Sequence, residues 1–413
     1  MKRIVYLSNI LYHDWNNKPT NHIRFIKLME PSIRLVSGLK TENFTELKNE
    51  KGETFDRNIF FKLSGIENIK KCYFSYNLEK ITQQSLDYFY SFINQDDFIL
   101  GIELDGNIRK ILSERNIKFI NFWIHSFHLF DDMCFMVNTN DISLFERIKQ
   151  FQIPQEKFYL YADIAKNILN NKFGEVDINN NSCLFAGQTY NDKSIEKDGI
   201  FLNITHFEEE IKELEKKYNT IYYIPHPYAP VEQNNDVNNF LKKHPKIEVI
   251  KNVPTYAMLA SDKIKEVIAI SSSVLYEAQF FNKKIKYLYK SMFNIDTEFR
   301  ENTFISVYND YLNPKFWSAV LDGYFYIDKT KADFTIYDKN KSRLRDILNI
   351  WHGYKQLSEI SVIEKHNKYE TELKNIAVLM FYIHKILANI TFGELKKEII
   401  NKKYYYKEIM TLG

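Results

Sequence analysis

The sequence predicts an α/β protein made of two Rossmann-like units, followed by C-terminal helices. Apolar strand-like runs alternate with helical patterns in both halves of the chain, which favours parallel sheets covered by helices. The 413 residues are too many for one compact core, so two domains are expected. A polar stretch over Lys172–Ser182, rich in Asn and Asp, is the best candidate for the linker between them.

The first unit contains strand-like runs separated by helical patterns. Near-continuous apolar runs such as FINFWI fit strands that are covered on both faces. The helical patterns cover ITQQSLDYFYSFIN and DGNIRKILSERN. The predicted strands are Arg3–Leu7, Cys72–Tyr76, Phe98–Glu103, Phe119–Ile124, Cys134–Val137 and Phe158–Tyr161.

The second unit repeats the alternation, and the pattern turns helical and aromatic after Asp296. We therefore expect an N-terminal domain over 1–175, a second domain over 176–345, and helices over 346–413 that return towards the first domain. The predicted helices are His206–Tyr218, Val237–His244 and Ser273–Phe281. The predicted strands are Leu184–Gln188, Thr220–Ile224, Ile247–Lys251, Val267–Ile270 and Ile285–Tyr289.

Composition excludes several classes of protein. The net charge of +3 is too small to indicate a nucleic-acid partner. Neither GxxxxGK[ST] nor GxGxxG occurs among the 12 glycines, and neither CxxC nor HExxH occurs at all, so no nucleotide loop of those types and no structural zinc site is expected. The three cysteines are far apart in apolar runs and are expected to be buried thiols.

The two ends of the chain give expectations about where in the cell the protein is found. MKRIVYLSNIL reads as a first strand rather than a signal peptide, and no run approaches the roughly 20 apolar residues of a membrane span. We therefore expect a cytoplasmic protein. The last stretch, LKKEIINKKYYYKEI, is basic and aromatic. It indicates either a peripheral contact with an anionic inner-membrane surface or a helix that packs across both domains with a solvated lysine face.

Two segments of the second unit predict an anion site. One strand ends in Pro225-His226-Pro227, and another ends in Ser271-Ser272-Ser273 ahead of a helix that carries Glu277. Ligands of open parallel sheets bind at the carboxyl ends of the strands. Hydroxyls and backbone N–H groups at a helix start, together with an imidazole, can hold a phosphate.

Two further strand ends carry polar groups. Gly187-Gln188 leads into a turn with Asp192, Lys193 and Ser194, and GIELDG places Glu103 and Asp105 at a strand end of the first unit. Glu103 and Asp105 are candidate acid/base groups. Each segment also has an ordinary interpretation: a solvated turn after Gln188, a structural loop histidine at 226, an N-cap at Ser272 or Ser273, and a helix cap at Asp105.

Taken in order, these motifs resemble those of GT-B glycosyltransferases that use CMP-activated sugars, including bacterial sialyltransferases. The order ELDG, GQTYNDKS, PHP, SSSVLYEA is similar to that of the retaining β-Kdo transferases of bacterial capsule and lipopolysaccharide synthesis, where Kdo is 3-deoxy-manno-octulosonic acid. The resemblance covers 102–289. ELDG replaces a contiguous acidic pair before glycine, so either Glu103 or Asp105 could be the functional carboxylate.

The resemblance implies a CMP-sugar donor, with CMP-Kdo first, and an oligosaccharide or glycolipid acceptor; other polysaccharide-assembly proteins are further expected partners. His226 and the serine hydroxyls would stabilise the phosphate of the leaving nucleotide. No cofactor is expected, and no metal is expected either, because a monophosphate leaving group needs no bridging ion. The other implied donor-binding residues are Gln188, Lys193, Ser194, Pro227 and Glu277.

For the chemical step, the resemblance implies that Asp192 is a nucleophile and that transfer proceeds with retention. Glu103 would assist as an acid or base, with Asp105 and His125 as acceptor-side candidates. Three alternatives remain. They are an inverting sialyltransferase-like enzyme with Glu103 or Asp105 as general base, a relative acting on a nucleoside diphosphate sugar (including an epimerase of the same architecture), and a non-catalytic nucleotide-binding partner in polysaccharide assembly.

Overall fold

The computed structural model describes two α/β sheets within the compact unit over 1–356, and the second compact unit, 357–413, lies outside the described residues. Cys72–Tyr76, Pro227 and the predicted helices over 346–413 also lie outside the described residues. The described residues are 2–10, 18–66, 81–132, 134–190, 192–198, 200–226, 229–250, 253–291, 293–300, 302–337 and 344.

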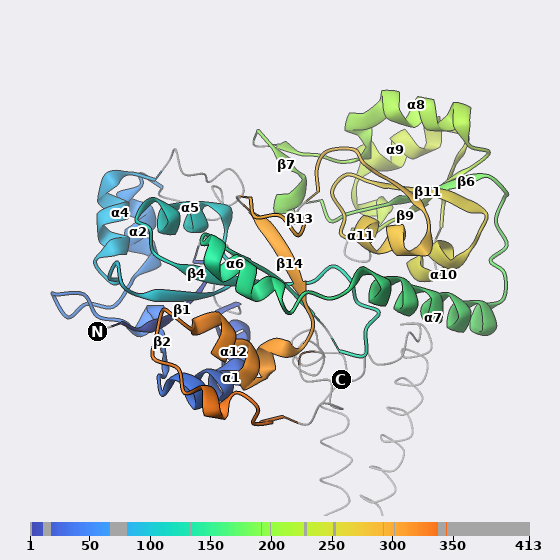
Figure 1. Cartoon of the computed structure of the whole chain (residues 1–413). Helices are drawn as coiled ribbons and strands as arrows, with labels where there is room; N and C mark the ends of the chain where they lie inside the picture. The colour runs from blue at the N-terminus through green and yellow to red at the C-terminus, as the bar shows by residue number, and fades with distance from the viewer. Residues whose placement is uncertain are drawn as a thin grey trace, which may run out of the picture. The chain divides into compact units, whose positions relative to one another are not determined.

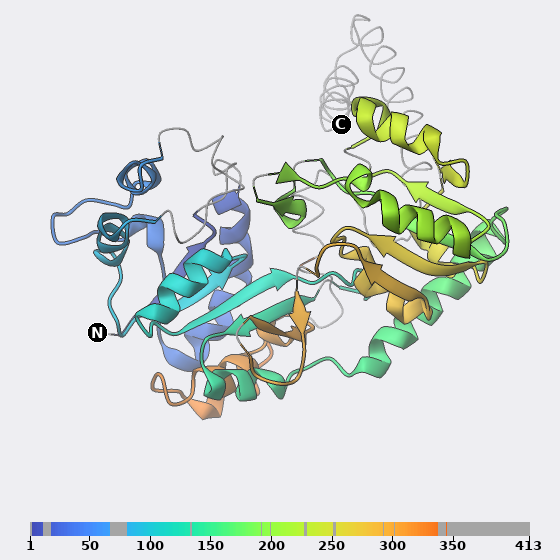
Figure 2. The ribbon, with the colours of Figure 1, turned by 90° about the horizontal axis from the view of Figure 1, so that it is seen from above.

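The first sheet has seven strands in the order β13-β14-β5-β4-β3-β1-β2. Strands β1 to β4 are parallel to one another, and β5 runs antiparallel to both of its neighbours, β4 and β14. Figure 2 shows β14, in orange, beside the teal strands. The strands are β1 Ile4–Ser8, β2 Thr41–Asn43, β3 Phe98–Ile102, β4 Phe119–Ile124, β5 Phe135–Thr139, β13 Asn294–Ile295 and β14 Thr303–Val307.

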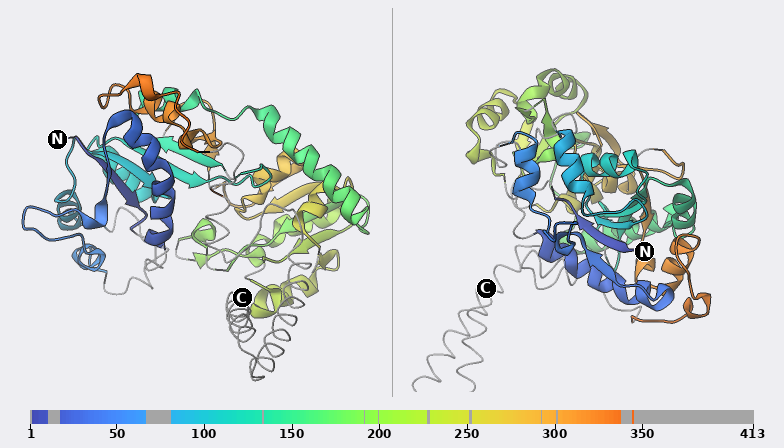
Figure 3. Two further views of the ribbon diagram at one scale, coloured as in Figure 1. Left: turned by 90° about the horizontal axis from the view of Figure 1, so that it is seen from below. Right: turned by 90° about the vertical axis from the view of Figure 1, so that its left-hand side faces the viewer.

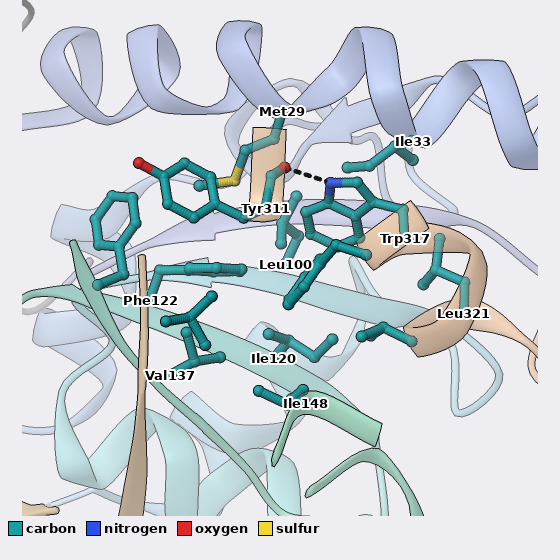
Figure 4. Packing of buried hydrophobic residues seen from close by; sticks show 14 of the residues in the cluster. Met29, Ile33, Leu100, Ile120, Phe122, Val137, Ile148, Tyr311, Trp317 and Leu321 are labelled. Carbon is teal, nitrogen blue, oxygen red and sulfur yellow. Dashed lines mark hydrogen bonds between the residues drawn. The ribbon is translucent and has the colours of Figure 1, made fainter. Parts of the chain in front are cut away.

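Helices cover both faces of this sheet (Figure 1). Alternate strand residues point to opposite faces, so Leu100 packs towards α1 and α12 while Ile99 packs towards α2, α4 and α5. Figure 4 shows the first of these cores, where the Trp317 indole donates to the Tyr311 carbonyl at 2.7 Å. The helices are α1 Lys18–Ser37, α2 Arg57–Leu63, α4 Gln83–Tyr90, α5 Gly106–Glu114, α6 Ile142–Lys149 and α12 Pro314–Leu321.

The second sheet has five parallel strands in the order β10-β9-β6-β11-β12. Helices α8 and α9 cover one face, and α10 and α11 cover the other (Figure 1). The long helix α7 packs against α10 and the 3₁₀ turn η6 (Figure 3). The strands are β6 Ser182–Ala186, β9 Ile221–Ile224, β10 Ile247–Val249, β11 Ile264–Ala269 and β12 Lys284–Tyr287. The helical elements are α7 Gln155–Phe173, α8 Glu208–Lys217, α9 Asn235–Lys243, α10 Thr255–Ala260, α11 Val274–Ala278 and η6 Gln279–Phe281.

The predicted α/β class, with two Rossmann-like sheets in one chain, is confirmed, and Cys134 and Cys183 are buried free thiols as expected. Two predictions are wrong. Phe158–Tyr161 lies within α7, because its apolar residues belong to a helical face that packs on η6, next to the second sheet. The second domain does not extend to 345, because β13, β14 and α12 return to the first sheet.

Within the described ranges, none of the helices has the length and hydropathy needed to cross a membrane.

Candidate active site

The carboxyl ends of β6 and β9 are held side by side by a glycine. The Gly187 N–H donates to the Ile224 carbonyl at 2.8 Å. A Cβ on Gly187 would lie 2.9 Å from that carbonyl oxygen and 3.1 Å from Pro225 Cα, closer than side chains tolerate. Glycine at this position therefore lets the segment with Gln188 lie against the segment with His226.

The Gln188 side chain joins two of the predicted motifs, GQTYNDKS and SSSVLYEA. Its Oε1 accepts the Ser271 N–H at 2.7 Å, and its Nε2 donates to Ser271 Oγ at 3.0 Å and to Ser194 Oγ at 3.2 Å. Ser271 and Ser194 are both buried. Because both amide hydrogens are used inside the protein, Gln188 positions the two serines, and its role as a direct ligand of the donor sugar stays a prediction.

The turn after Gln188 presents Asp192. The Asp192 Oδ1 accepts the Ser194 N–H at 2.7 Å, which shapes the 3₁₀ turn η3 (Lys193–Ile195). Asp192 itself is exposed, so its carboxylate stays accessible while the turn fixes its position. The Lys193 side chain lies outside what the structure describes.

His226 is half-buried, and burial lowers the pKa of its imidazole, an effect that the negative charge of Asp192 partly opposes. The two groups are therefore electrostatically coupled, although they come from different strand ends. At neutral pH the imidazole is neutral and has one N–H to donate.

The three serines differ in environment. The Ser271 oxygen accepts from Gln188, which leaves its own hydroxyl proton to be donated elsewhere. Ser272 Oγ accepts the Val274 N–H at 3.4 Å, a weak cap of the kind expected from the ordinary interpretation, and Ser273 is exposed. Because α11 has only five residues, the macrodipole contribution expected at its start is small.

Glu277 is bonded within the protein, and its donor-binding role stays a prediction. Its carboxylate is buried and accepts the His128 N–H at 2.8 Å and the Tyr256 hydroxyl at 2.8 and 2.9 Å on its two oxygens. His128 follows β4 of the first sheet, whereas Glu277 lies in α11. Glu277 therefore links α11, the helix that follows the three serines, to the loop after β4 of the first sheet.

The ELDG turn of the first sheet also depends on a glycine. A Cβ on Gly101 would lie 2.6 Å from Leu104 Cγ, so only glycine lets Leu104 fold back over β3. The Leu104 N–H donates to Asn121 Oδ1 at 2.9 Å, and the Glu103 N–H donates to the Phe122 carbonyl at 2.8 Å. Glu103 stands at the tip of this turn with φ of 51°, a conformation that is uncommon for a non-glycine residue and is found at functional sites.

The other two acceptor-side candidates, Asp105 and His125, make hydrogen bonds that stabilise the fold. Asp105 is buried and caps α5 by accepting the Asn107 N–H at 2.9 Å, as its ordinary interpretation requires. His125 is completely buried. Its Nδ1 accepts the Phe127 N–H at 2.9 Å, so Nε2 carries the proton and donates to Ser306 Oγ, also at 2.9 Å. Glu103 is therefore the remaining candidate carboxylate on the first sheet, and the acceptor role predicted for His125 is corrected.

Sequence reasoning missed three residues that shape this region, namely Asn121, His128 and Tyr256. Their roles come from contacts between distant segments, and no local pattern marks them. In the part of the chain that the structure describes, no group of three or more His, Cys, Asp or Glu side chains is arranged to hold a metal ion.

Residues 125–290 match the family model described as alpha-2,8-polysialyltransferase. The match covers about two-fifths of the chain. It includes the loop with His128 and the three residues Gln188, Ser194 and Ser271, which we call the Gln188 cluster. It agrees with the resemblance to CMP-sugar-using glycosyltransferases and supports a glycosyltransferase as the class of enzyme. No curated protein matches the chain.

Three solved structures show weak likeness to the chain. The KpsC β-Kdo 2,7-transferase of Thermosulfurimonas dismutans is 13% identical over 85% of this chain and 99% of its own, with a TM-score of 0.37. The KpsC β-Kdo 2,4-transferase of the same organism is 13% identical over 46% and 68%, with a TM-score of 0.30. The UDP-GlcNAc 2-epimerase of Methanocaldococcus jannaschii is 12% identical over 85% and 100%, with a TM-score of 0.26.

Proposed function

We propose that this chain is a glycosyltransferase that moves a 3-deoxy acidic sugar from its CMP donor to an oligosaccharide or glycolipid acceptor in bacterial surface-polysaccharide synthesis. The observation that carries the proposal is the Gln188 cluster. The amide of the half-buried Gln188 holds Ser271 and Ser194 at two strand ends, and the Asp192 turn that it supports interacts electrostatically with His226 at a third.

The leaving group would be a nucleoside monophosphate. The Ser271 and Ser273 hydroxyls and the neutral His226 N–H would donate to its phosphate as negative charge develops. Donors held in place before the reaction contribute about 3–4 kcal/mol each to such a step, as the removal of one oxyanion-hole donor shows. The proposal needs no metal ion, and full activity in the presence of EDTA would test that part.

The motif order GQ…D.S, PHP, S…EA supports Kdo as the donor sugar. The match of 125–290 to the polysialyltransferase model supports sialic acid as the second candidate. Both sugars carry a carboxylate at the anomeric carbon and a deoxygenated neighbouring carbon, so one site chemistry would serve either.

Asp192 would attack the anomeric carbon, with the C–O bond to CMP breaking as the glycosyl ester forms. An acceptor hydroxyl would then displace Asp192 and lose its proton to Glu103, giving net retention. In the inverting alternative, Glu103 deprotonates the acceptor for direct displacement of CMP and Asp192 stays unmodified. The exposed, fixed carboxylate of Asp192 favours the first route.

A thermal-shift panel of CMP, UDP and GDP tests the donor class. Stabilisation by CMP alone is the expected result, and stabilisation by UDP alone would instead support a nucleoside diphosphate sugar enzyme or an epimerase. Transfer assays with CMP-Kdo and CMP-sialic acid would then identify the sugar, and NMR of the product's anomeric configuration would separate retention from inversion. CMP binding without transfer or hydrolysis of either donor would favour a non-catalytic partner.

A further inference from the structure

Three aromatic rings lie together on one face of the first sheet, near the strand end that leads into the ELDG turn. The Trp123 ring lies 5.4 Å from the Phe293 ring, and Phe293 lies 5.4 Å from Phe304, measured between ring centroids. Phe304 is buried, whereas Trp123 and Phe293 each keep part of their surface exposed. We call these three residues the aromatic shelf.

The shelf is next to the candidate acceptor-side carboxylate. The Phe122 carbonyl that accepts the Glu103 N–H belongs to the peptide that joins Phe122 to Trp123. Phe293 comes from the segment between β12 of the second sheet and β13 of the first, and Ser291 fixes its backbone. Trp123 and Phe293 therefore stand where the chain passes from the donor-side sheet to the acceptor-side sheet.

Packing alone does not account for a tryptophan at this position. The Trp123 Nε1 is buried and has no hydrogen-bond partner among the described residues, so a phenylalanine would fill the same space without that unsatisfied donor. The Arg109 guanidinium lies 5.5 Å from the centroid of Phe304, which places a positive charge at the shelf.

We propose that the aromatic shelf binds the terminal sugar ring of the acceptor, and that Arg109 favours an acidic sugar over a neutral one. The apolar C–H face of a pyranose would stack on Trp123 and Phe293, which would bring an acceptor hydroxyl to the Glu103 turn. This inference rests on the proposed function, because it assigns the acceptor side of the same site.

Saturation-transfer NMR on the full chain tests the shelf directly. The probes are methyl glycosides and trisaccharides of Kdo and sialic acid, with the corresponding galactosides as neutral comparators. We expect saturation of the sugar ring protons, with stronger binding of the acidic probes. Trp123→Leu and Phe293→Ala should each weaken that binding about tenfold, the loss expected for one aromatic anchor. Tyr326→Ala is the matched control, because Tyr326 is an aromatic residue outside the shelf that is 87% exposed.

CMP binding is measured by thermal shift in the same samples. It distinguishes failure of the shelf proposal from failure of the proposed function. Unchanged CMP stabilisation with lost probe binding supports the shelf. Equal probe binding by wild type and Trp123→Leu would overturn it, as would the absence of saturation from every probe. Parallel loss of CMP binding and thermal stability would overturn it in favour of a packing role, and Trp123→Phe serves if the leucine variant does not fold. Probe binding without any CMP stabilisation of the wild type would reject the proposed function but leave the shelf standing.

Discussion

Gln188 and Ser271 are 83 residues apart in the chain, yet they share two hydrogen bonds, one to the backbone N–H and one to the hydroxyl of the serine. The serine that would face a donor phosphate is thus oriented by a side chain from a neighbouring strand. A substitution at Gln188 should therefore alter the orientation of the Ser271 hydroxyl.

Gln188→Ala should lower both stability and CMP affinity. It leaves the buried Ser271 N–H without its acceptor, which costs about 1–3 kcal/mol. Urea unfolding should show that loss, and calorimetric titration should show CMP binding about tenfold weaker or worse. Gln233→Ala, at an exposed glutamine of the same unit, should change neither quantity. An unaltered CMP affinity in the Gln188 variant would remove the positioning role.

Asp192→Asn should abolish transfer but leave CMP binding largely intact. The asparagine Oδ1 can still accept the Ser194 N–H, so the turn keeps its shape while the nucleophile is lost. His226→Ala should weaken both transfer and CMP binding. Asp198→Asn is a suitable control, because Asp198 is exposed nearby with φ of 52°, where asparagine is well tolerated. Wild-type turnover by Asp192→Asn would exclude the covalent route.

Gly101→Ala should reduce transfer at least tenfold without changing CMP affinity. The new Cβ would displace Leu104, and with it the left-handed turn that presents Glu103. Gly106→Ala is the matched control from the same segment, because its Cβ would meet only Arg109 Nη2, at an ordinary 3.7 Å. The test compares kcat with CMP binding, and a wild-type transfer rate for Gly101→Ala would count against a role for the Glu103 turn.

Glu277→Ala should destabilise the chain more than it weakens CMP binding. It leaves the His128 N–H and the Tyr256 hydroxyl without their shared acceptor, at about 1–3 kcal/mol for each group that stays buried. Glu277→Gln keeps an acceptor oxygen and should lose less. Glu209→Gln, at an exposed glutamate, should have little effect. Denaturant unfolding and CMP titration of the same samples would show which quantity changes, and a loss confined to CMP affinity would support the predicted donor-binding role of Glu277 instead.

Acidification should unfold the protein partly through His125. Burial lowers the pKa of this imidazole from 6.5 to about 3. Above pH 6.5 both the folded and the unfolded forms are neutral there, so the stabilising contribution is complete. As the pH falls towards 3, the unfolded chain takes up a proton that the folded chain resists, and stability falls by about 1.4 kcal/mol per pH unit. His125→Gln should show a shallower loss of unfolding free energy over this range, and an unchanged slope would contradict the assignment.

The strand ends could be read from the sequence because each is a short apolar run followed by polar residues, as at Gly187-Gln188, His226 and Ser271. The partners of those side chains could not be read, because they depend on register between distant segments. Glu277 follows the serine motif directly and so resembled a donor ligand, but it bonds to His128, 149 residues away. His125 was misassigned for the converse reason: a histidine beside other polar residues resembles a site, and only its burial shows that both ring nitrogens are used within the fold.

The return of the chain to the first sheet also escaped prediction, because β14 is five residues long and lies in a stretch dominated by aromatic residues. Its consequence concerns synthesis and dissection of the protein. Strand β14 completes the sheet beside β5 only after all of the second sheet has been made, so the N-terminal sheet cannot finish folding on the ribosome before Val307 emerges. A truncation before Asn294 would leave β5 as an unpaired edge prone to aggregation. A fragment spanning 155–291, by contrast, contains every strand of the second sheet together with α7, which packs on α10 and η6, and is the piece to express alone.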